Sequence, residues 1–289
     1  MRSRPSNFFI CAFLAAAGAL LVFPLIITFA NSFMTETEIG LAYTSKRSVF
    51  DLIDGEYTKF AKIRLIPETA TLSQYAQVLF FQPSFLILLL NSVKLTAPVI
   101  AGNTAVSLMC AYGFVTWRWR YKEAVFFAYI VVMLLPLQAV LVPNYIIADA
   151  LGITDSYLAI ILPGVFAPFG TFILRQSMKN IPEAYFEAAR IDGAGEWYIF
   201  TRIAAPQAKP GIAALAMLVF VEYWNLVEQS VVFIKEYYRE PLSVYLSRIA
   251  DGNAALIFAA SCVYMFLPLW FLTIGQENLE KGIELSGIK

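Results

Sequence analysis

The sequence contains no histidine. Since histidine is the usual general base and a frequent metal ligand, its absence excludes a Ser-His protease and the common zinc sites. Cysteine is also scarce, and Cys11, Cys110 and Cys262 each lie within an apolar run, which indicates neither a disulfide framework nor a metal centre. Charge is scarce and balanced, with 21 basic and 21 acidic residues, so no basic surplus indicates nucleic-acid binding.

Apolar residues are abundant instead. They make up 59% of the 289 residues, only 15% are charged, and the mean hydropathy is +0.66. A soluble domain has about one quarter charged residues, so this composition indicates a chain that lies in lipid. About 20 apolar residues are needed for a helix to cross the hydrocarbon core. Six segments meet or approach that length, at residues 8–30, 95–115, 124–148, 157–174, 211–233 and 254–275.

The first apolar segment has an alternative interpretation. Arg2 and Arg4 precede it, and residues 28–30 are small-x-small, as at the cleavage site of a signal peptide. Its apolar length exceeds the usual signal core of roughly 7–15 residues, and five further segments follow. We therefore expect residues 8–30 to remain as a membrane span.

Basic residues predict the orientation, because they concentrate in cytoplasmic loops. The short connection 149–156 has none and is predicted to lie outside, whereas the long segment 31–91 is less informative. Both termini are then cytoplasmic. The predicted organisation is a cytoplasmic N-terminus (1–7), the first span (8–30), an extracytoplasmic segment (31–91), a five-helix core (92–275) containing a cytoplasmic loop (175–210), and a cytoplasmic tail (276–289).

The outer part of the chain is mixed in charge. Residues 31–83 contain glycine, proline and several acids, which predicts a small folded excursion or an extended loop. Residues 84–90 form a short apolar run that we expect to lie at the membrane interface. Lys94 follows near the outer end of the second span, where its ammonium group can reach water.

A polar, helix-forming stretch interrupts the apolar segments at residues 181–206. Pro182 suits the first position of a helix, and Asp192-Gly193 marks a turn. A second short helix is expected from residue 195, with Pro206 near its end. The loop is thus predicted to be two short helices hinged at glycine. The residues expected to share one approachable side of the first helix are Tyr185, Ala188, Ala189 and Asp192.

The spacing in this stretch resembles the cytoplasmic loop of ABC-importer permeases. Glu187-Ala188-Ala189 is followed by Gly193, Ile203 and Pro206 at the spacing typical of that family. Further segments resemble the smaller, six-span permease of maltose-type carbohydrate importers, and the likeness extends from residue 91 to residue 289. Ala205 departs from the pattern, which usually has leucine there, and the outer segment is longer than usual. The segments that carry the likeness are 91–92, 111–114, 135–138, 142–143, 151–153, 169–176, 222–225 and 282–289.

This resemblance implies an all-α permease subunit of a binding-protein-dependent importer in a bacterial cell (inner) membrane. It implies four kinds of partner: a second, similar permease, two ABC ATPases, an extracytoplasmic solute-binding protein and a carbohydrate. The chain itself has no G-x-x-x-x-G-K-[ST] phosphate loop, so ATP and magnesium would be bound by the ATPases and no cofactor by this chain. The residues implied to couple to the ATPase are Glu183, Glu187, Ala188, Ala189, Asp192, Gly193, Ile203 and Pro206.

Polar side chains within spans are candidates for a solute pathway, because lipid does not tolerate them unpaired. Aromatic rings beside carboxylates and amides suit sugars, which present apolar ring faces and hydroxyl groups. The same residues could equally bridge helices or mark the membrane interface. The candidates are Asn103, Gln138, Glu222, Tyr223, Trp224 and Asn225.

Two other functions remain open from the residues alone. A secondary transporter driven by an ion gradient often has internal repeats, and none is evident here. A membrane-embedded sugar or lipid transferase could use outer acids such as Asp51 and Asp54. A paired-aspartate protease is excluded, since the six predicted spans contain no aspartate.

Overall fold

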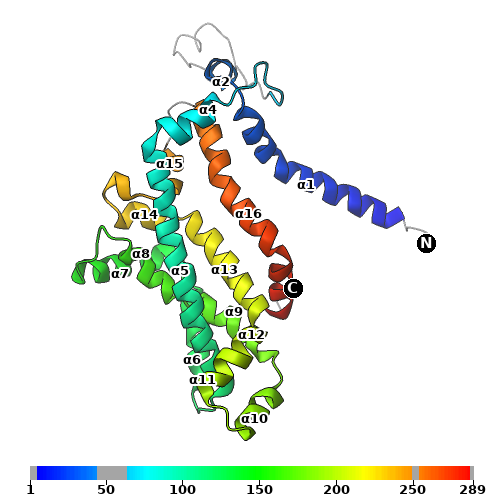
Figure 1. Ribbon diagram of the computed structural model, residues 1–289, viewed down its shortest axis with the longest axis vertical. Coiled ribbons are helices and arrows are strands. Elements are labelled where there is room, and N and C mark those ends of the chain that lie inside the picture. The colour runs from blue at the N-terminus through cyan, green and yellow to red at the C-terminus, as the bar shows by residue number, and fades with distance from the viewer. Residues whose placement is uncertain (1–4, 44–63, 249–253, 287–289) are drawn as a thin grey trace. The chain divides into compact units, whose positions relative to one another are not determined.

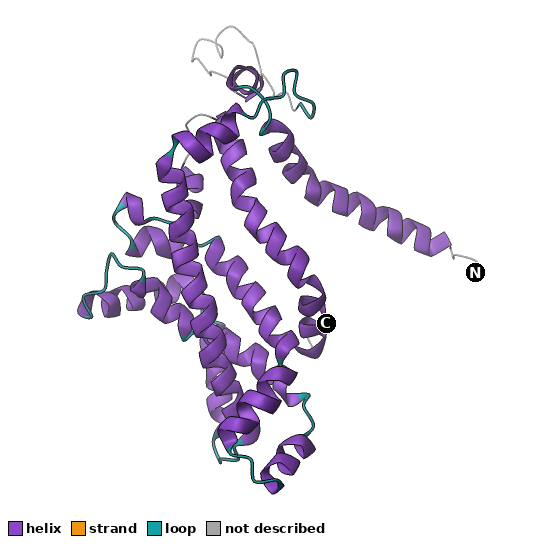
Figure 2. Cartoon of the chain, in the orientation of Figure 1, coloured by secondary structure: helices purple, strands orange, loops and turns teal. Residues whose placement is uncertain are grey.

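The computed structural model describes residues 5–43, 64–248 and 254–286. Every regular element within these ranges is a helix, as Figures 1 and 2 show, which confirms the prediction of an all-α chain. Asp51 and Asp54, the acids considered for a transferase, lie outside the described residues.

The chain divides into two compact units, and the first combines residues 1–86 with residues 246–266. Ser32 Oγ and the Tyr75 hydroxyl are hydrogen-bonded at 2.6 Å, and the Thr71 N–H donates to the Phe33 carbonyl at 2.8 Å. The described part of the predicted outer excursion is therefore folded against the end of the first helix. The elements of this unit are α1 (Pro5–Asn31), α2 (Glu36–Tyr43), α4 (Ser73–Ala76), the π-helical η1 (Gln77–Phe81), the first residues of α5 (Pro83–Thr116) and the start of α16 (Ala254–Ser286).

The second unit combines residues 87–245 with residues 267–289 and contains the largest apolar core. Its elements after α5 are α6 (Lys122–Met133), α7 (Leu137–Ala150), α8 (Leu158–Val165), α9 (Pro168–Lys179), α10 (Glu183–Ile191), α11 (Glu196–Ile199), the π-helical η2 (Phe200–Ala204), α12 (Ala205–Gln207), α13 (Lys209–Trp224), α14 (Glu228–Phe233), the 3₁₀ turn η3 (Tyr237–Arg239) and α15 (Leu242–Arg248).

Four stretches of the described residues are long and apolar enough to cross a membrane. Two bent helix pairs raise the possible number to six, and those pairs are α6 with α7 and residues 196–207 with α13. The predicted six-span architecture is therefore supported by length and composition. The four stretches are Ile10–Asn31, Pro83–Thr116, Leu158–Lys179 and Ala255–Gln276.

Two details of the predicted spans are wrong, and a third stays a prediction. Residues 84–90 are the first turns of α5, whose 34 residues extend over roughly 51 Å and so exceed a hydrocarbon core of about 30 Å, and their place at the membrane interface stays a prediction. The third span is not one helix, since α6 and α7 meet at 99° around Pro136. The fifth ends at Trp224, and residues 228–233 form the separate helix α14.

A buried cation joins two of the core helices. The side chain of Arg175 in α9 is only 4% exposed, and its guanidinium donates to the Glu123 carboxylate of α6 at 2.6 Å. The same guanidinium lies 3.7 Å from the centroid of the Phe126 ring. A charge in an apolar core is costly unless it is paired, so this contact holds α6 and α9 in one arrangement. The helix α9 continues directly toward the polar loop.

Candidate functional site

The first helix of the polar loop, α10, begins and ends within one residue of the predicted positions. Pro182 has the extended backbone of an N-cap (φ −57°, ψ 131°), so α10 begins at Glu183 rather than at the proline. At the other end, Gly193 adopts a left-handed φ of +81°, which glycine alone adopts without strain. The Ala194 N–H donates to the Ala189 carbonyl at 2.9 Å and the Gly193 N–H to the Arg190 carbonyl at 3.1 Å. This is a Schellman motif, which fixes the direction in which the chain leaves α10.

One aromatic side chain anchors α10 to the core. Phe186 is 3% exposed, and its ring meets that of Tyr112 edge-on at 6.3 Å. Tyr112 belongs to α5, and its ring also lies 5.3 Å from Phe200 of η2. Both helical segments of the loop therefore pack on the same tyrosine of a membrane-spanning helix.

Polar contacts reinforce this anchor. The Glu196 carboxylate accepts a hydrogen bond from the Tyr112 hydroxyl at 2.6 Å and another from Arg190 Nε at 2.8 Å. Glu183 forms an ion pair with Arg118 at 2.8 Å, which joins the start of α10 to the turn after α5. The two loop helices and α5 are thus connected at three points. A rotation of α10 would therefore disturb its contacts with α5 and with the second loop helix.

The opposite side of α10 is exposed. Ile191 is 86% exposed and Tyr185 is 55% exposed, although both are apolar over most of their surface. Glu187, Ala188 and Asp192 lie on the surface as well, and Glu187 makes no ion pair with any residue that the structure describes. Ala189 differs from the prediction, since it packs against the core rather than sharing this face.

The second half of the loop contains a π-helical turn. The residues from Glu196 to Gln207 pass through α11, η2 and α12, and the π turn lies just before Pro206, which has no N–H to donate. Ile203 is half-buried against the core and Pro206 is exposed. The helix ends one residue after Pro206, and α13 begins with a 72° change of direction.

The candidate pathway residues do not form one cluster. Asn103 is 1% exposed, and its amide nitrogen donates to the carbonyls of Gly164, Val165 and Ala167 at 2.9, 3.3 and 3.2 Å. These carbonyls lie where α8 gives way to α9, so Asn103 satisfies backbone groups freed by a helix break. Tyr223 is buried against Gly164, and Trp224 stacks on Phe220 at 5.3 Å.

Four other polar side chains of the predicted spans, Gln138, Glu222, Asn225 and Glu228, are exposed. The Gln138 amide of α7 donates to the Glu228 carboxylate of α14 at 3.1 Å. Glu222 and Asn225 at the end of α13 are exposed too, and the Asn225 amide donates to the Val221 carbonyl at 2.9 Å. Since lipid does not accept such groups, this set faces either water or another protein subunit.

Sequence reasoning did not single out the residues that anchor the loop. Tyr112 was noted only within the family-like segment 111–114, and Phe186 and Glu196 only as part of the loop helices. A weak signal existed for Phe186, since it is the bulky apolar residue between two glutamates in a short polar helix. No local signal pairs Tyr112 with Glu196, because they are 84 residues apart.

Comparison with known proteins finds relatives of similar sequence and a solved structure of similar fold. Protein LplC of Bacillus subtilis is 29% identical over 82% of this chain and 73% of its own length. The arabinooligosaccharides transport system permease protein AraQ of Halalkalibacterium halodurans is 25% identical over 87% of this chain and 95% of its own length. The fold resembles a chain from the crystal structure of a bacterial ABC transporter involved in the import of alginate, with a TM-score of 0.78 at 21% identity, over 96% of this chain and 98% of that one.

A family model also matches residues 70–284 of the 289, a range that contains the polar loop, its anchor and the exposed polar residues of α7, α13 and α14. The chain therefore belongs to the family of binding-protein-dependent transport system inner membrane components.

Proposed function

We propose that this chain is one of two membrane-spanning permease subunits of an ATP-driven carbohydrate importer, and that α10 is the surface on which an ABC ATPase docks. The observation that carries this proposal is the two-sided nature of α10. One side is locked to the core through Phe186, whereas the other exposes Tyr185, Ile191 and Glu187, and Glu187 forms no ion pair within the described part of the chain. An exposed face with apolar and charged groups together suits a protein partner.

The joints of α10 make it suitable for transmitting motion. Gly193 fixes its C-terminal end through the Schellman motif, and the Arg118–Glu183 ion pair holds its N-terminal end. A rigid element with defined joints can convert the approach of two ATPases into a movement of packed helices. The Tyr112–Glu196 hydrogen bond would pass this movement to α5, and the continuation of α9 into the loop would pass it to the core.

The energy for transport would come from the partner subunits. The sequence has no G-x-x-x-x-G-K-[ST] loop, so we assign the binding of ATP and magnesium, and the hydrolysis itself, to two separate ATPases. The roles left for this chain are to hold the ATPase at α10 and to change the access of the solute pathway. An extracytoplasmic solute-binding protein would deliver the solute.

The exposed polar residues of the spans support a pathway along α7, α13 and α14. Gln138 and Glu228 are already hydrogen-bonded to each other, and Glu222 and Asn225 add a carboxylate and an amide nearby in the sequence. A second permease would cover this surface and close the pathway. Carboxylates and amides bind sugar hydroxyls well. Relatives named for the transport of arabinooligosaccharides and of polygalacturonan/rhamnogalacturonan support a carbohydrate as the solute. Asn103 is better explained as a support for the helix break.

The first experiment is a pull-down of the tagged chain from its native membrane. We expect an ATPase and a second permease to co-purify with the wild type, and Glu187→Lys to release the ATPase while retaining the permease. Asp149→Lys, which reverses the charge of an exposed residue at the end of α7, is the control and should retain both. Recovery of the chain alone, stable and active in ion-driven transport, would instead identify a secondary transporter.

The second experiment tests the turn at Gly193, where the chain leaves α10. Gly193→Pro forces φ to about −65° where the chain needs +81°, so we expect membrane insertion to persist while solute uptake falls and ATP hydrolysis becomes independent of transport. Gly195→Ala is the matched control, because Gly195 has φ −70° and a Cβ there would meet no atom within 4 Å. Normal uptake by Gly193→Pro would show that α10 is not the coupling element.

A further inference from the structure

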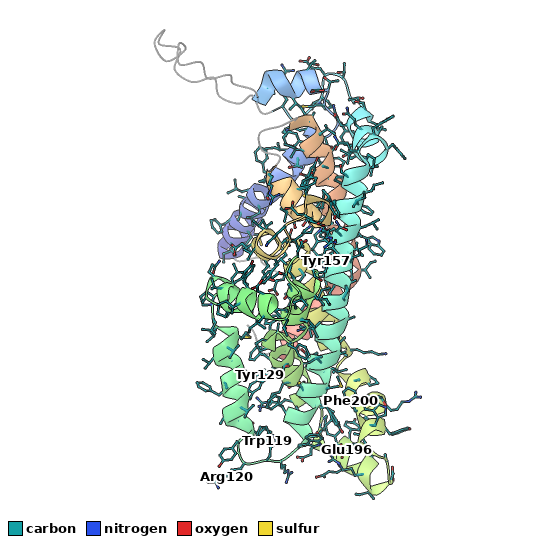
Figure 3. The ribbon with its side chains drawn as sticks, turned by 90° about the vertical axis from the view of Figure 1, so that its left-hand side faces the viewer. Trp119, Arg120, Tyr129, Tyr157, Glu196 and Phe200 are labelled. Atoms are coloured by element: carbon teal, nitrogen blue, oxygen red, sulfur yellow. The ribbon has the colours of Figure 1, made fainter. Side chains whose placement is uncertain are left out.

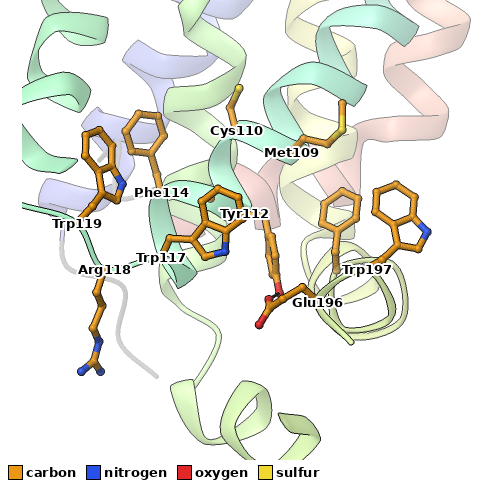
Figure 4. Close-up of a pocket in the computed structure, with 11 residues that line it drawn as sticks. Met109, Cys110, Tyr112, Phe114, Trp117, Arg118, Trp119, Glu196 and Trp197 are labelled. Carbon is orange, nitrogen blue, oxygen red and sulfur yellow. Dashed lines mark hydrogen bonds between the residues drawn. The ribbon is translucent and has the colours of Figure 1, made fainter. Parts of the chain in front are cut away.

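The turn after α5 borders a cavity whose wall includes the loop anchor Tyr112 and Glu196, but whose interior has no role in the proposed transport function. Its volume is about 730 Å³, within the range of small-molecule pockets. Figure 4 shows aromatic rings along its sides, with Met109 and Cys110 at one end and the Glu196 carboxylate near Tyr112. The residues that line it are Met109, Cys110, Tyr112, Gly113, Phe114, Trp117, Arg118, Trp119, Glu196, Trp197 and Phe200.

We propose that this cavity binds one acyl chain of an anionic phospholipid, whose headgroup lies against Arg120 and Lys122. The first argument is depth. The cavity is formed by the last two turns of α5, a helix long and apolar enough to span the membrane, and by the residues just beyond its end at Thr116. We place this end of α5 at the boundary between the hydrocarbon core and water, because the apolar helix gives way there to the charged run 117–122.

The second argument is the kind of side chain at the rim. Trp117 is 60% exposed and Trp197 is 69% exposed, although both are large and apolar. Tryptophan and tyrosine concentrate at membrane interfaces, because their rings suit the headgroup region. Figure 3 places Trp119 and Arg120 at the end of the second unit that also holds Glu196 and Phe200, while Tyr157 lies farther along it. The aromatic rim is thus confined to one end of the unit.

The third argument is charge. Residues 117–122 read Trp-Arg-Trp-Arg-Tyr-Lys, so a cation follows each ring. Arg118 is paired with Glu183, and in Figure 4 its guanidinium extends away from the rings. Arg120 and Lys122 form no ion pair with the residues that the structure describes. Arg120 and Lys122 do not line the cavity, but they directly follow its lining residues Trp117 to Trp119 in the chain, and Arg120 lies over the Tyr121 ring at 5.5 Å. Two cations next to an apolar cavity match an anionic headgroup attached to a hydrocarbon chain.

The two nearby acids each have another cationic partner, although Glu123 also lies close enough to Lys122 to attract it. Glu196 at the cavity wall accepts from Arg190 and from the Tyr112 hydroxyl, and Glu123 is held by the buried Arg175. Both carboxylates therefore already have partners of their own. A free phosphate would use the cations but leave the ring-lined walls without a ligand, so the lipid is the occupant that accounts for both. A bound chain would also contact Trp197 in the second loop helix.

The test measures lipid retention rather than transport. The full chain, purified with the subunits that accompany it, is delipidated and titrated with phosphatidylglycerol or phosphatidylethanolamine, and bound lipids are counted by native mass spectrometry. Free glycerol 3-phosphate serves as the headgroup-only probe. We expect one phosphatidylglycerol to be retained selectively. The double variant Arg120→Gln/Lys122→Gln should weaken its affinity by roughly twenty-fivefold, at roughly fivefold for each charge removed.

A second variant fills the cavity without removing charge. A Cβ at Gly113 would come no closer than 3.9 Å to another side chain, the Trp117 ring, so Gly113→Leu adds bulk inside the cavity and should abolish retention. Lys179→Gln/Lys209→Gln is the control, because it removes two exposed cations at the neighbouring ends of α9 and α13 and should retain the lipid.

Three results would overturn the proposal. These are equal retention by the wild type and both test variants, equal retention of phosphatidylethanolamine, and binding of free glycerol 3-phosphate as strong as that of the lipid. A photo-crosslinker at Met109 adds a check on the assembled complex, because it should label lipid, and a crosslink to a partner protein would also refute the idea. None of these readouts depends on solute uptake, so failure here leaves the proposed transport function unaffected.

Discussion

At the scale of single residues, close contacts in the second unit leave no room for additional atoms. Gly170 in α9 lies so near Asn103 and Ser107 of α5 that a Cβ would collide with Asn103 Oδ1 and Ser107 Oγ. Gly164 lies in the same way against the Tyr223 hydroxyl and Val99. The helices α5, α8 and α9 can therefore approach each other closely only because these positions have no side chain.

Gly170→Ala should destabilise the protein for this reason. Overpacking a close contact costs about 1–3 kcal/mol, since neighbouring side chains or the backbone must shift. Thermal unfolding in detergent, followed by tryptophan fluorescence, measures the change. Gly18→Ala in α1, where a Cβ would meet no atom within 4 Å, should unfold at the wild-type temperature. Equal midpoints for the two variants would show that the contact relaxes freely.

The carboxylate of Asp155 should make the stability of the fold depend on pH. The backbone N–H groups of Lys235 and Glu236 donate to its carboxylate at 2.9 and 3.4 Å, and these bonds, with Arg239 nearby, lower the pKa of Asp155. Because its pKa is lower in the folded than in the unfolded chain, the ionised carboxylate of Asp155 stabilises the fold. This stabilisation is fully present above about pH 4 and is lost as the pH falls through the folded pKa.

Asp155→Asn isolates this effect, because it retains the carbonyl acceptor but not the charge. We expect the wild type to unfold at a higher temperature than the variant at pH 7 and the gap to narrow as the pH is lowered below about 4. Midpoints measured in one detergent from pH 7 to pH 3 test this. A gap that stays constant over that range would mean that the carboxylate charge contributes nothing.

At the scale of elements, the break between α8 and α9 is the feature that most depends on one distant side chain. Asn103 donates to three carbonyls there, and α9 leads directly to the polar loop. Asn103→Leu keeps the side-chain size and removes all three bonds, so we expect a loss of roughly 1–2 kcal/mol, the upper range for interhelical hydrogen bonds in membranes.

Unfolding in detergent and solute uptake in vesicles together measure this variant. Uptake should fall more than stability alone explains, because the position of α9 sets that of α10. Thr96→Val is the control, since Thr96 is buried in the same helix but donates to none of the three carbonyls. A fully active Asn103→Leu protein would show that the break holds its geometry without the amide.

Elements differ in how far the sequence predicts them. The ends of the loop helix were predictable to within a residue, because proline and glycine constrain φ locally. The sharp bend at Pro136 was not, since a proline within an apolar run is compatible with a mild kink or a full break. The role of Asn103 was also hidden, because its partners are backbone carbonyls, which have no sequence signature.

At the scale of the whole molecule, the orientation remains a prediction from basic residues. It places the connection 149–156 outside and α10 in the cytoplasm. In a version with all three cysteines changed to serine, Asp149→Cys and Asp192→Cys place single thiols on exposed positions at the two sides. A membrane-impermeant maleimide added to right-side-out vesicles should label residue 149 and leave residue 192 unlabelled until the vesicles are opened. The reverse pattern would invert the topology and remove α10 from the reach of a cytoplasmic ATPase.

The hydrogen bond between Tyr112 and Glu196 has a consequence for engineered chimeras. The loop from residue 183 to residue 207 is continuous in sequence, which suggests exchanging it between related importers so that each would couple to the other's ATPase. The loop is held, however, by Tyr112 of α5, which lies 84 residues before its hydrogen-bond partner Glu196 in the chain. A transplanted loop would therefore arrive without its support, and a working exchange requires the recipient to present a matching hydroxyl and ring at the position of Tyr112.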